Sequence, residues 1–310
     1  MRRAFSDTLV EVADVNDKMV FLTGDLGFEV FTELEKKHPT KYINAGIAEA
    51  QLAMCATGLA LSGFRPVIYS IASFMTGRAF ELIRTGINYQ QLPVLIIGAG
   101  GGYTYANSGV THHAAEDLGL MQLMPGMQII NPGSPSEVRE LMLQFFEQDK
   151  PAYMRVGRFG EPEYTAKDPI ILGKARLVSE AKKQVSKPSV ALLSTGDTVI
   201  SCIEANKLLK EQGFDVTHYQ YHSLSPFDVK TLEQVLSNYD HVIVVEDHFP
   251  IGGLYSQVSS FHAGSNSSAK LTRLGPPHEL LFGEPSIAQL REQFSYDVSG
   301  IVSTCMALQR

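Results

Sequence analysis

Residues 44 to 113 hold the pattern that decides the fold. They begin with Asn-Ala-Gly-Ile-Ala-Glu at 44–49, which predicts a turn that leads into a helix. Two apolar runs, 67–71 and 94–97, predict buried strands, and a loop with candidate site residues follows each of them. Apolar strands that alternate with helices indicate a parallel sheet covered on both faces. Ligands of such sheets bind beyond the carboxyl ends of the strands, so these loops are candidate sites.

Composition places the chain among soluble globular proteins. Its 310 residues suit two domains of about 150 residues each. A net charge of −7 gives no basic surface for nucleic acid or an acidic membrane. No apolar run is long enough for a membrane span, and the first residues lack the pattern of a signal peptide. Three widely spaced cysteines fit reduced thiols, so we expect a cytoplasmic protein.

The same alternation of elements extends through the chain. In the first half it predicts helices over 2–15 and 135–148 and strands over 19–23, 127–130 and 153–158. In the second half it predicts strands over 190–193, 216–221 and 241–246 with helices between them. We therefore expect two three-layer α/β/α domains with mostly parallel sheets. The first domain is placed at 1–158, a linker at 159–187 and the second domain at 188–310.

Short motifs in the predicted loops resemble those of a known protein family. Gly-Ile-Ala-Glu at 46–49, Ser73-Phe74 and Thr111-His112, at this spacing, resemble the pyrimidine-binding domain of the transketolase family. The second half resembles the family's C-terminal domain in its Pro-x-Asp turn at 226–228 and its Glu-Asp-His segment at 246–248. We interpret that Asp-His pair as structural, because polar caps are common at loop ends.

The resemblance covers two of the family's three domains. The family marks its diphosphate and Mg²⁺ site by Gly-Asp-Gly followed by Asn, and no segment here matches that pattern. The resemblance therefore implies thiamine diphosphate and Mg²⁺ as cofactors, with no metal ligand in this chain. It also implies a separate N-terminal subunit that carries the diphosphate and Mg²⁺ site. The two subunits would form an α2β2 heterotetramer around a homodimer of this chain.

The resemblance implies roles for four residues around the cofactor. Glu49 would bind N1′ of the pyrimidine from an apolar slot, where loss of hydration favours the protonated carboxyl. Phe74 would stack on the pyrimidine ring, and Ile47 would also contact the cofactor. His112 would contact the substrate as a proton relay or hydrogen-bond donor. Outside this motif, Glu49 is an ordinary first-turn acid that complements a helix dipole, and Phe74 is an ordinary core residue.

Five further residues are candidates with more than one interpretation. Asp25 lies near the cofactor in the family, or it is a turn or cap residue. Arg155 and Arg158 are both eligible to hold a substrate phosphate, or to form a salt bridge at the domain boundary. Arg78 could pair with a ligand phosphate or with an acid across a subunit interface. Ser108 stands where full-length transketolases have an aspartate that contacts a sugar hydroxyl, so the donor sugar stays open.

These residues predict a transferase subunit. It would transfer a two-carbon ketol unit between sugars, which we expect to be phosphorylated, through a thiamine-bound carbanion, and only with its partner. Enzymes similar to deoxyxylulose-phosphate synthase or to the E1-β subunit of 2-oxo-acid dehydrogenases are alternatives, and Thr111-His112 favours the former over the latter. A non-catalytic scaffold subunit is the remaining alternative, against which Glu49, Phe74 and His112 argue.

Overall fold

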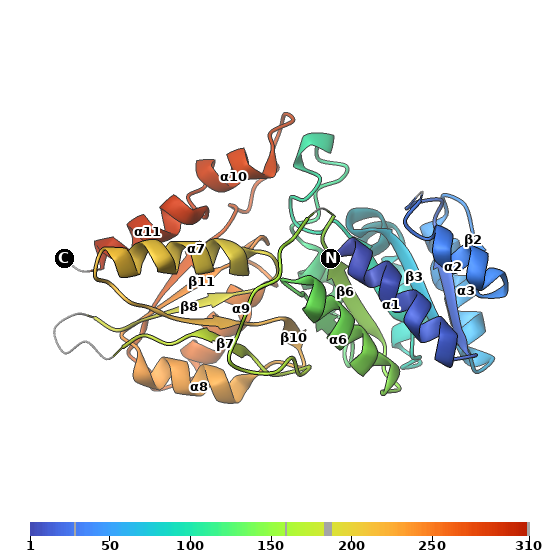
Figure 1. Ribbon diagram of the computed structural model, residues 1–310, viewed down its shortest axis with the longest axis horizontal. Coiled ribbons are helices and arrows are strands. Elements are labelled where there is room, and N and C mark those ends of the chain that lie inside the picture. Colours follow the sequence, from blue (N-terminus) through green and yellow to red (C-terminus); the bar gives the residue numbers. More distant parts are fainter. Residues whose placement is uncertain (28, 159, 183–187, 309–310) are drawn as a thin grey trace.

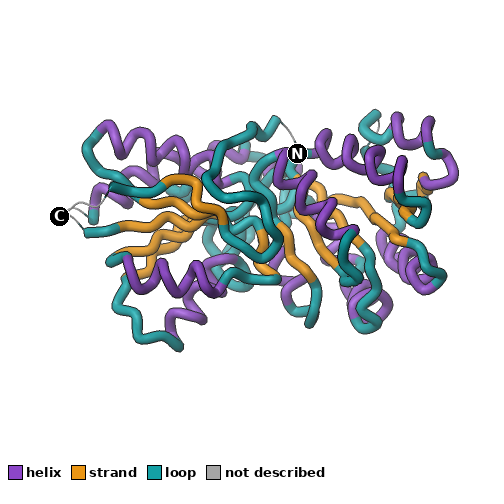
Figure 2. The backbone as a smooth tube through the Cα atoms, turned by 60° about the horizontal axis from the view of Figure 1, so that its bottom comes forward, coloured by secondary structure: helices purple, strands orange, loops and turns teal. Residues whose placement is uncertain are grey.

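The computed structural model describes residues 1–27, 29–158, 160–182 and 188–308. Two α/β bodies lie side by side, and the N-terminus starts near the junction between them (Figure 1). Each body has a mostly parallel sheet between layers of helices, which confirms the predicted fold class (Figure 2).

The first sheet has seven strands in the order β10-β5-β6-β4-β3-β1-β2. Neighbouring strands from β5 to β2 are parallel, and β10 is antiparallel to β5. Their bounds are β1 Met19–Thr23, β2 Tyr42–Asn44, β3 Arg65–Ile71, β4 Leu95–Ala99, β5 Gln128–Ile130, β6 Ala152–Val156 and β10 Ser223–Ser225. The strands β1, β4, β5 and β6 are buried along their whole length, as expected for a sheet covered on both faces.

Helices cover this sheet on both faces. The helices of the first body are α1 Arg2–Val15, α2 Thr32–Lys37, α3 Glu49–Leu61, α4 Phe80–Leu82, α5 Asp117–Gln122 and α6 Pro135–Phe146. Alternate residues of the strands face opposite layers. Phe21 packs with the apolar faces of α1 and α6, whereas Leu22 packs with α3. A π-helical segment, Phe74–Arg78, follows β3 at the carboxyl edge of the sheet.

The second sheet has five strands in the order β12-β11-β8-β9-β7, and only β7 is antiparallel. The strands are β7 Arg176–Ser179, β8 Val190–Ser194, β9 Thr217–Gln220, β11 His241–Val245 and β12 Lys270–Leu274. The helices are α7 Thr198–Glu211, α8 Val229–Asn238, α9 Leu254–Ala263, α10 Ile287–Gln293 and α11 Val298–Ala307. Helices α7 and α11 lie on one face, and α8 on the other (Figure 1).

The two bodies exchange strands at their boundary. The predicted linker 159–187 contains β7, which belongs to the second sheet, and β10 of the second half extends the first sheet. One apolar cluster runs from Leu52 and Ile96 in the first body to Leu193 and Val244 in the second. The two bodies therefore pack against each other through a shared apolar core.

A buried charged network also holds the boundary together. Asp117 is fully buried, and Arg155 donates to both oxygens of its carboxylate. The same arginine donates to the backbone carbonyl of Asp247 in the second body at 3.0 Å. The Asp247 carboxylate accepts from the Tyr103 backbone N–H at 3.2 Å, in the loop that follows β4. The predicted structural use of Asp247 and His248 agrees with this burial.

Lowering the pH should destabilise this boundary through His248. Its Nδ1 donates to the Phe249 carbonyl at 2.8 Å, and its Nε2 accepts from the Gly119 N–H at 3.1 Å. Burial lowers the pKa of His248 to about 4. An unfolded imidazole binds its proton near pH 6.5. The unfolded chain therefore gains the proton first as the pH falls, and stability drops between about pH 6.5 and 4.

We expect urea unfolding to show a loss of roughly 1.4 kcal/mol per pH unit from this ring in that window. His248→Gln should flatten the slope, whereas His278→Gln, at an exposed site, should not change it. An equally steep slope in His248→Gln would show that other groups cause the acid sensitivity.

Candidate functional site

The predicted site residues form a row along the carboxyl edge of the first sheet. Strands β6, β4, β3, β1 and β2 are successive neighbours, and a loop with a candidate residue follows each of them. In that order the segments that follow the strands supply Arg158, His112, Phe74, Asp25 and Glu49, with Phe74 and Glu49 at the starts of helical segments. The sequence places these residues far apart, and the parallel sheet brings their loops to one edge.

Glu49 is the first residue of α3, and its side chain is only 1% exposed. One carboxylate oxygen accepts from the Ser70 hydroxyl at 3.0 Å, and the other accepts from the Arg78 guanidinium at 2.8 Å. The expectation of a buried carboxyl agrees with the structure, but the expectation of apolar surroundings does not. A buried carboxyl needs polar partners, and Ser70 and Arg78 supply them. This burial also separates Glu49 from an ordinary surface acid at a helix start.

Arg78 comes from the π-helical segment after β3, and its side chain is 53% exposed. Its guanidinium lies 4.8 Å from the centre of the Phe74 ring. The sequence predicted a ligand phosphate or an acid across a subunit interface as its partner, and Arg78 contacts neither here. Arg78 instead pairs with Glu49 of the same chain, because helical spacing puts it one turn after Phe74 at the same sheet edge.

Aromatic rings continue the row from Phe74 toward Arg158. The rings of Phe74 and His112 meet edge to face, with centres 5.1 Å apart. Tyr105 lies 6.0 Å beyond His112, and the Arg158 guanidinium lies 4.6 Å from the Tyr105 ring centre. Gly100, at a φ of +68°, leaves the space that the Tyr105 ring fills.

Two hydrogen bonds fix the loop with His112. The Ser73 hydroxyl donates to the Thr111 carbonyl at 3.0 Å, which ties this loop to the end of β3. The Thr111 hydroxyl lies 2.9 Å from Nδ1 of His112. Partial burial, with smaller effects of His113 and Arg158, lowers the pKa of His112. The ring is therefore neutral at pH 7, when it can donate from one nitrogen and accept at the other.

The glycines that follow β4 leave space that side chains of this chain fill. Arg155 lies against Gly101, and Asp247 lies against Gly102. His113 is buried, and its Nε2 lies 3.0 Å from the Ala106 carbonyl, so it holds the loop rather than facing the edge.

The remaining cofactor candidates lie in turns at the same edge. Asp25 has a left-handed backbone with a φ of +58° and accepts from the Asn44 amide at 2.9 Å. Asn44 also accepts from the Gly46 N–H at 3.0 Å, so it joins the turn after β1 to the turn before α3. Asp25 caps no helix, because α2 begins at Thr32. Asn44 is a functional candidate that sequence reasoning missed.

Ile47 and Ser108 both lie on the surface. Ile47 is 76% exposed, two residues before the buried Glu49. Ser108 ends a short helical turn in the loop between Tyr105 and His112.

The two candidate arginines have different surroundings. Arg155 is buried, and its donors are committed to Asp117, Asp247 and Ala114. This corresponds to the boundary salt bridge, so substrate contact by Arg155 is not retained. Arg158 lines a cavity of about 1200 Å³ between α1, α2 and the start of α6. Arg2 lines the same cavity, and no local sequence pattern singled it out.

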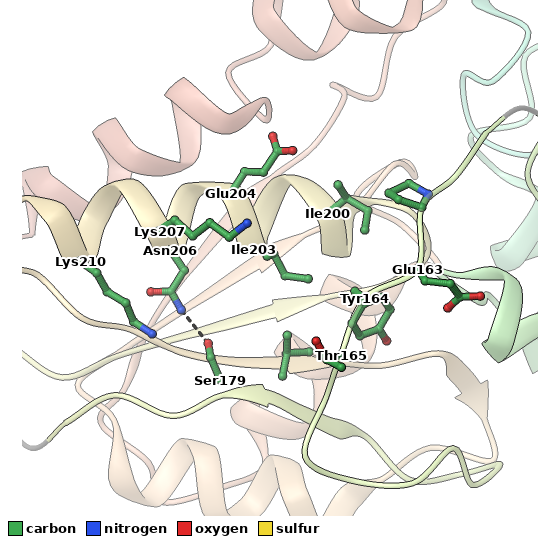
Figure 3. A pocket seen from close by; sticks show the side chains of 12 residues that line it. Glu163, Tyr164, Thr165, Ser179, Ile200, Ile203, Glu204, Asn206, Lys207 and Lys210 are labelled. Carbon is green, nitrogen blue, oxygen red and sulfur yellow. Dashed lines mark hydrogen bonds between the residues drawn. The ribbon is translucent and has the colours of Figure 1, made fainter.

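A second cavity, of about 430 Å³, lies in the second body between α7, β7 and residues 162–165 (Figure 3). None of the predicted site residues lines it. Among residues 1–27, 29–158, 160–182 and 188–308, no three His, Cys, Asp or Glu side chains gather as a metal site. Within the same described ranges, no helix is both long and apolar enough to cross a membrane.

Comparison with known proteins assigns the chain to a family. Residues 1–159 match the family model of the transketolase pyrimidine-binding domain, and residues 179–301 match that of the transketolase C-terminal domain. The chain belongs to the transketolase family. The family assignment made from the loop motifs is thereby confirmed, and with it the pairing of these two domains.

Individual relatives of this transketolase-family chain are similar over most of its length. An apulose-4-phosphate transketolase subunit of Phocaeicola vulgatus is 30% identical over 82% of this chain and 80% of its own. A 6-deoxy-6-sulfo-D-fructose transketolase subunit of Clostridium sp. is 29% identical over 97% of this chain and 92% of its own. A solved structure described as a split gene transketolase, an inactive beta4 tetramer, superposes with a TM-score of 0.86 at 29% identity. It covers 100% of this chain and 98% of its own.

Proposed function

We propose that this chain is the C-terminal subunit of a two-subunit transketolase that uses thiamine diphosphate. The observation that supports it best is the pairing of a buried carboxyl, Glu49, with an aromatic face, Phe74, at one sheet edge. A pyrimidine has a flat ring for such a face and a ring nitrogen for such a carboxyl, so these residues fit that end of the cofactor. When bound, thiamine diphosphate supplies a nucleophilic carbon that accepts and releases the two-carbon unit.

Each residue of the row has a defined task in this proposal. Glu49 holds a proton at N1′ of the pyrimidine, and Ser70 fixes the carboxyl orientation. Phe74 stacks on the ring. His112, neutral at pH 7, donates a hydrogen bond to a substrate oxygen and returns or accepts a proton there. The diphosphate and Mg²⁺ are held by the partner subunit, which closes the edge at which Ile47 is exposed.

The substrate is proposed to be a sugar with an anionic end. Both relatives named above act, by their names, on a sugar phosphate or a sulfo-sugar. Arg158 and Arg2 line one cavity, which lies between α1, α2 and the start of α6. A guanidinium binds phosphate or sulfonate oxygens through paired donors, so this cavity suits the anionic end.

Assembly as an α2β2 heterotetramer in the cytoplasm completes the proposal. The three cysteines are unpaired, as reducing conditions would leave them. The test is reconstitution: this chain and a subunit with the Gly-Asp-Gly…Asn pattern are mixed with thiamine diphosphate, Mg²⁺ and ketose phosphates. We expect the mixture to transfer the two-carbon unit and neither chain to do so by itself. If the complex assembles and binds the cofactor but transfers the unit to none of the acceptors, the scaffold alternative is favoured.

Replacing Arg158 tests whether this residue binds the anionic end of the sugar substrate. Arg158→Ala should raise KM for the ketose phosphate about tenfold to a hundredfold with a smaller change in kcat, because a charge-assisted contact contributes about 1.5–3 kcal/mol. Arg158→Lys should recover part of the loss, since it keeps the charge but not the paired donors. An unchanged KM in Arg158→Ala would remove this residue from the substrate site.

A further inference from the structure

Arg78 occupies the two surfaces that the proposed function assigns to the pyrimidine. Its guanidinium donates to the Glu49 oxygen Oε2 at 2.8 Å, and Oε1 is already engaged by Ser70. The same guanidinium lies 4.8 Å from the centre of the Phe74 ring. A pyrimidine that stacks on Phe74 and hydrogen-bonds Glu49 needs one face of that ring and one of those oxygens.

We propose that Arg78 is a displaceable guard of the pyrimidine site, which leaves Glu49 and Phe74 when the cofactor binds. This inference rests on the proposed function. The side chain is able to move, because it is 53% exposed and its two described contacts are both with site residues. Glu49, by contrast, is 1% exposed at the first turn of α3, and Ser70 fixes it from β3.

Few other charged groups face Glu49. Among the described residues at this edge, the His112 ring contacts the Phe74 ring. Asp25 accepts a hydrogen bond from Asn44 in the turn after β1. Neither has a described hydrogen bond to Glu49. The guard contact with Arg78 is therefore the interaction to change.

The experiment measures cofactor binding by calorimetry on the complex of this chain with its partner subunit, with Mg²⁺ present. Arg78→Ala, Arg78→Lys and the control Arg84→Ala, at an exposed position of the following helical segment, are compared with the parent at pH 7 and pH 8. Circular dichroism and size-exclusion chromatography check that each variant folds and assembles.

The inference predicts that Arg78→Ala binds thiamine diphosphate about tenfold more tightly than the parent at pH 8. Arg78→Lys should fall between the two, since an ammonium can pair with Glu49 but does not lie flat on Phe74. Arg84→Ala should match the parent.

Weaker or equal binding in Arg78→Ala would overturn the guard and leave the proposed function intact. Absence of binding in the parent complex and in every variant would instead overturn the proposed function, and the guard with it. Should Arg78→Ala fail to assemble, Arg78→Lys decides: an affinity equal to that of the parent overturns the guard, and tighter binding supports it.

Discussion

Glu49→Gln is expected to reduce turnover of the assembled complex by about 10²–10⁴-fold, the usual contribution of a positioned acid or base. Glutamine keeps the volume and the hydrogen bond with Ser70, so folding and assembly should survive. It cannot hold a proton at N1′, and that is the task proposed for Glu49. The measurement is the steady-state rate of two-carbon transfer, with thiamine diphosphate binding recorded on the same sample.

A surface glutamate serves as the control for this change. Glu81 is exposed in α4, a few residues after Arg78, and Glu81→Gln should leave the rate within about twofold of the parent, in line with the usual small effect of surface substitutions. Near-normal turnover of Glu49→Gln in a complex that binds the cofactor would show that the acid assigned here is wrong.

Breaking the Asp117–Arg155 pair is expected to give the largest loss of stability. Both side chains are buried, and Asp117 also accepts from the Tyr153 hydroxyl and from its neighbour's backbone N–H at 2.6 Å each. Removing one partner leaves the other as an uncompensated buried charge, which costs about 3–5 kcal/mol. Arg155→Met and Asp117→Asn should each lower the free energy of unfolding by that amount, measured in urea.

The double variant separates this pair from its surroundings. Asp117→Asn with Arg155→Met should cost less than the sum of the single changes, because neither charge is then left alone. Arg139 and Glu11 form a half-exposed pair, and Arg139→Met should cost less than about 1 kcal/mol. Full additivity in the Asp117–Arg155 cycle would contradict a direct energetic coupling between these two buried charges.

Local patterns in the sequence predicted the sheets and the loops well, because alternation and turn residues are short-range signals. The helix that the turn at 44–49 predicted begins at Glu49. The strand β10 escaped detection because its three residues pair with a strand almost a hundred positions earlier, which no local pattern encodes. Likewise, β7 lies in a stretch whose glycine, proline and charge content is typical of a linker.

At the site, motifs identified residues but not their contacts. Glu49, Phe74 and His112 lie along one edge, as the resemblance implied. The partner of Arg78 was missed, because the sequence shows the helical spacing from Phe74 but not that Glu49 of another loop lies in reach. Arg155 and Arg158 looked equivalent, and only the depth of β6 in the sheet separates the buried one from the one at the edge.

The most direct test of the central claim, a cofactor site shared between two polypeptides, is calorimetric titration of thiamine diphosphate with Mg²⁺. The titration is run on this chain alone and on this chain mixed with the subunit that holds the Gly-Asp-Gly…Asn pattern. We expect binding in the mixture and none to this chain alone, because Glu49 and Phe74 hold only the pyrimidine end. Tight binding to this chain alone would contradict the shared site.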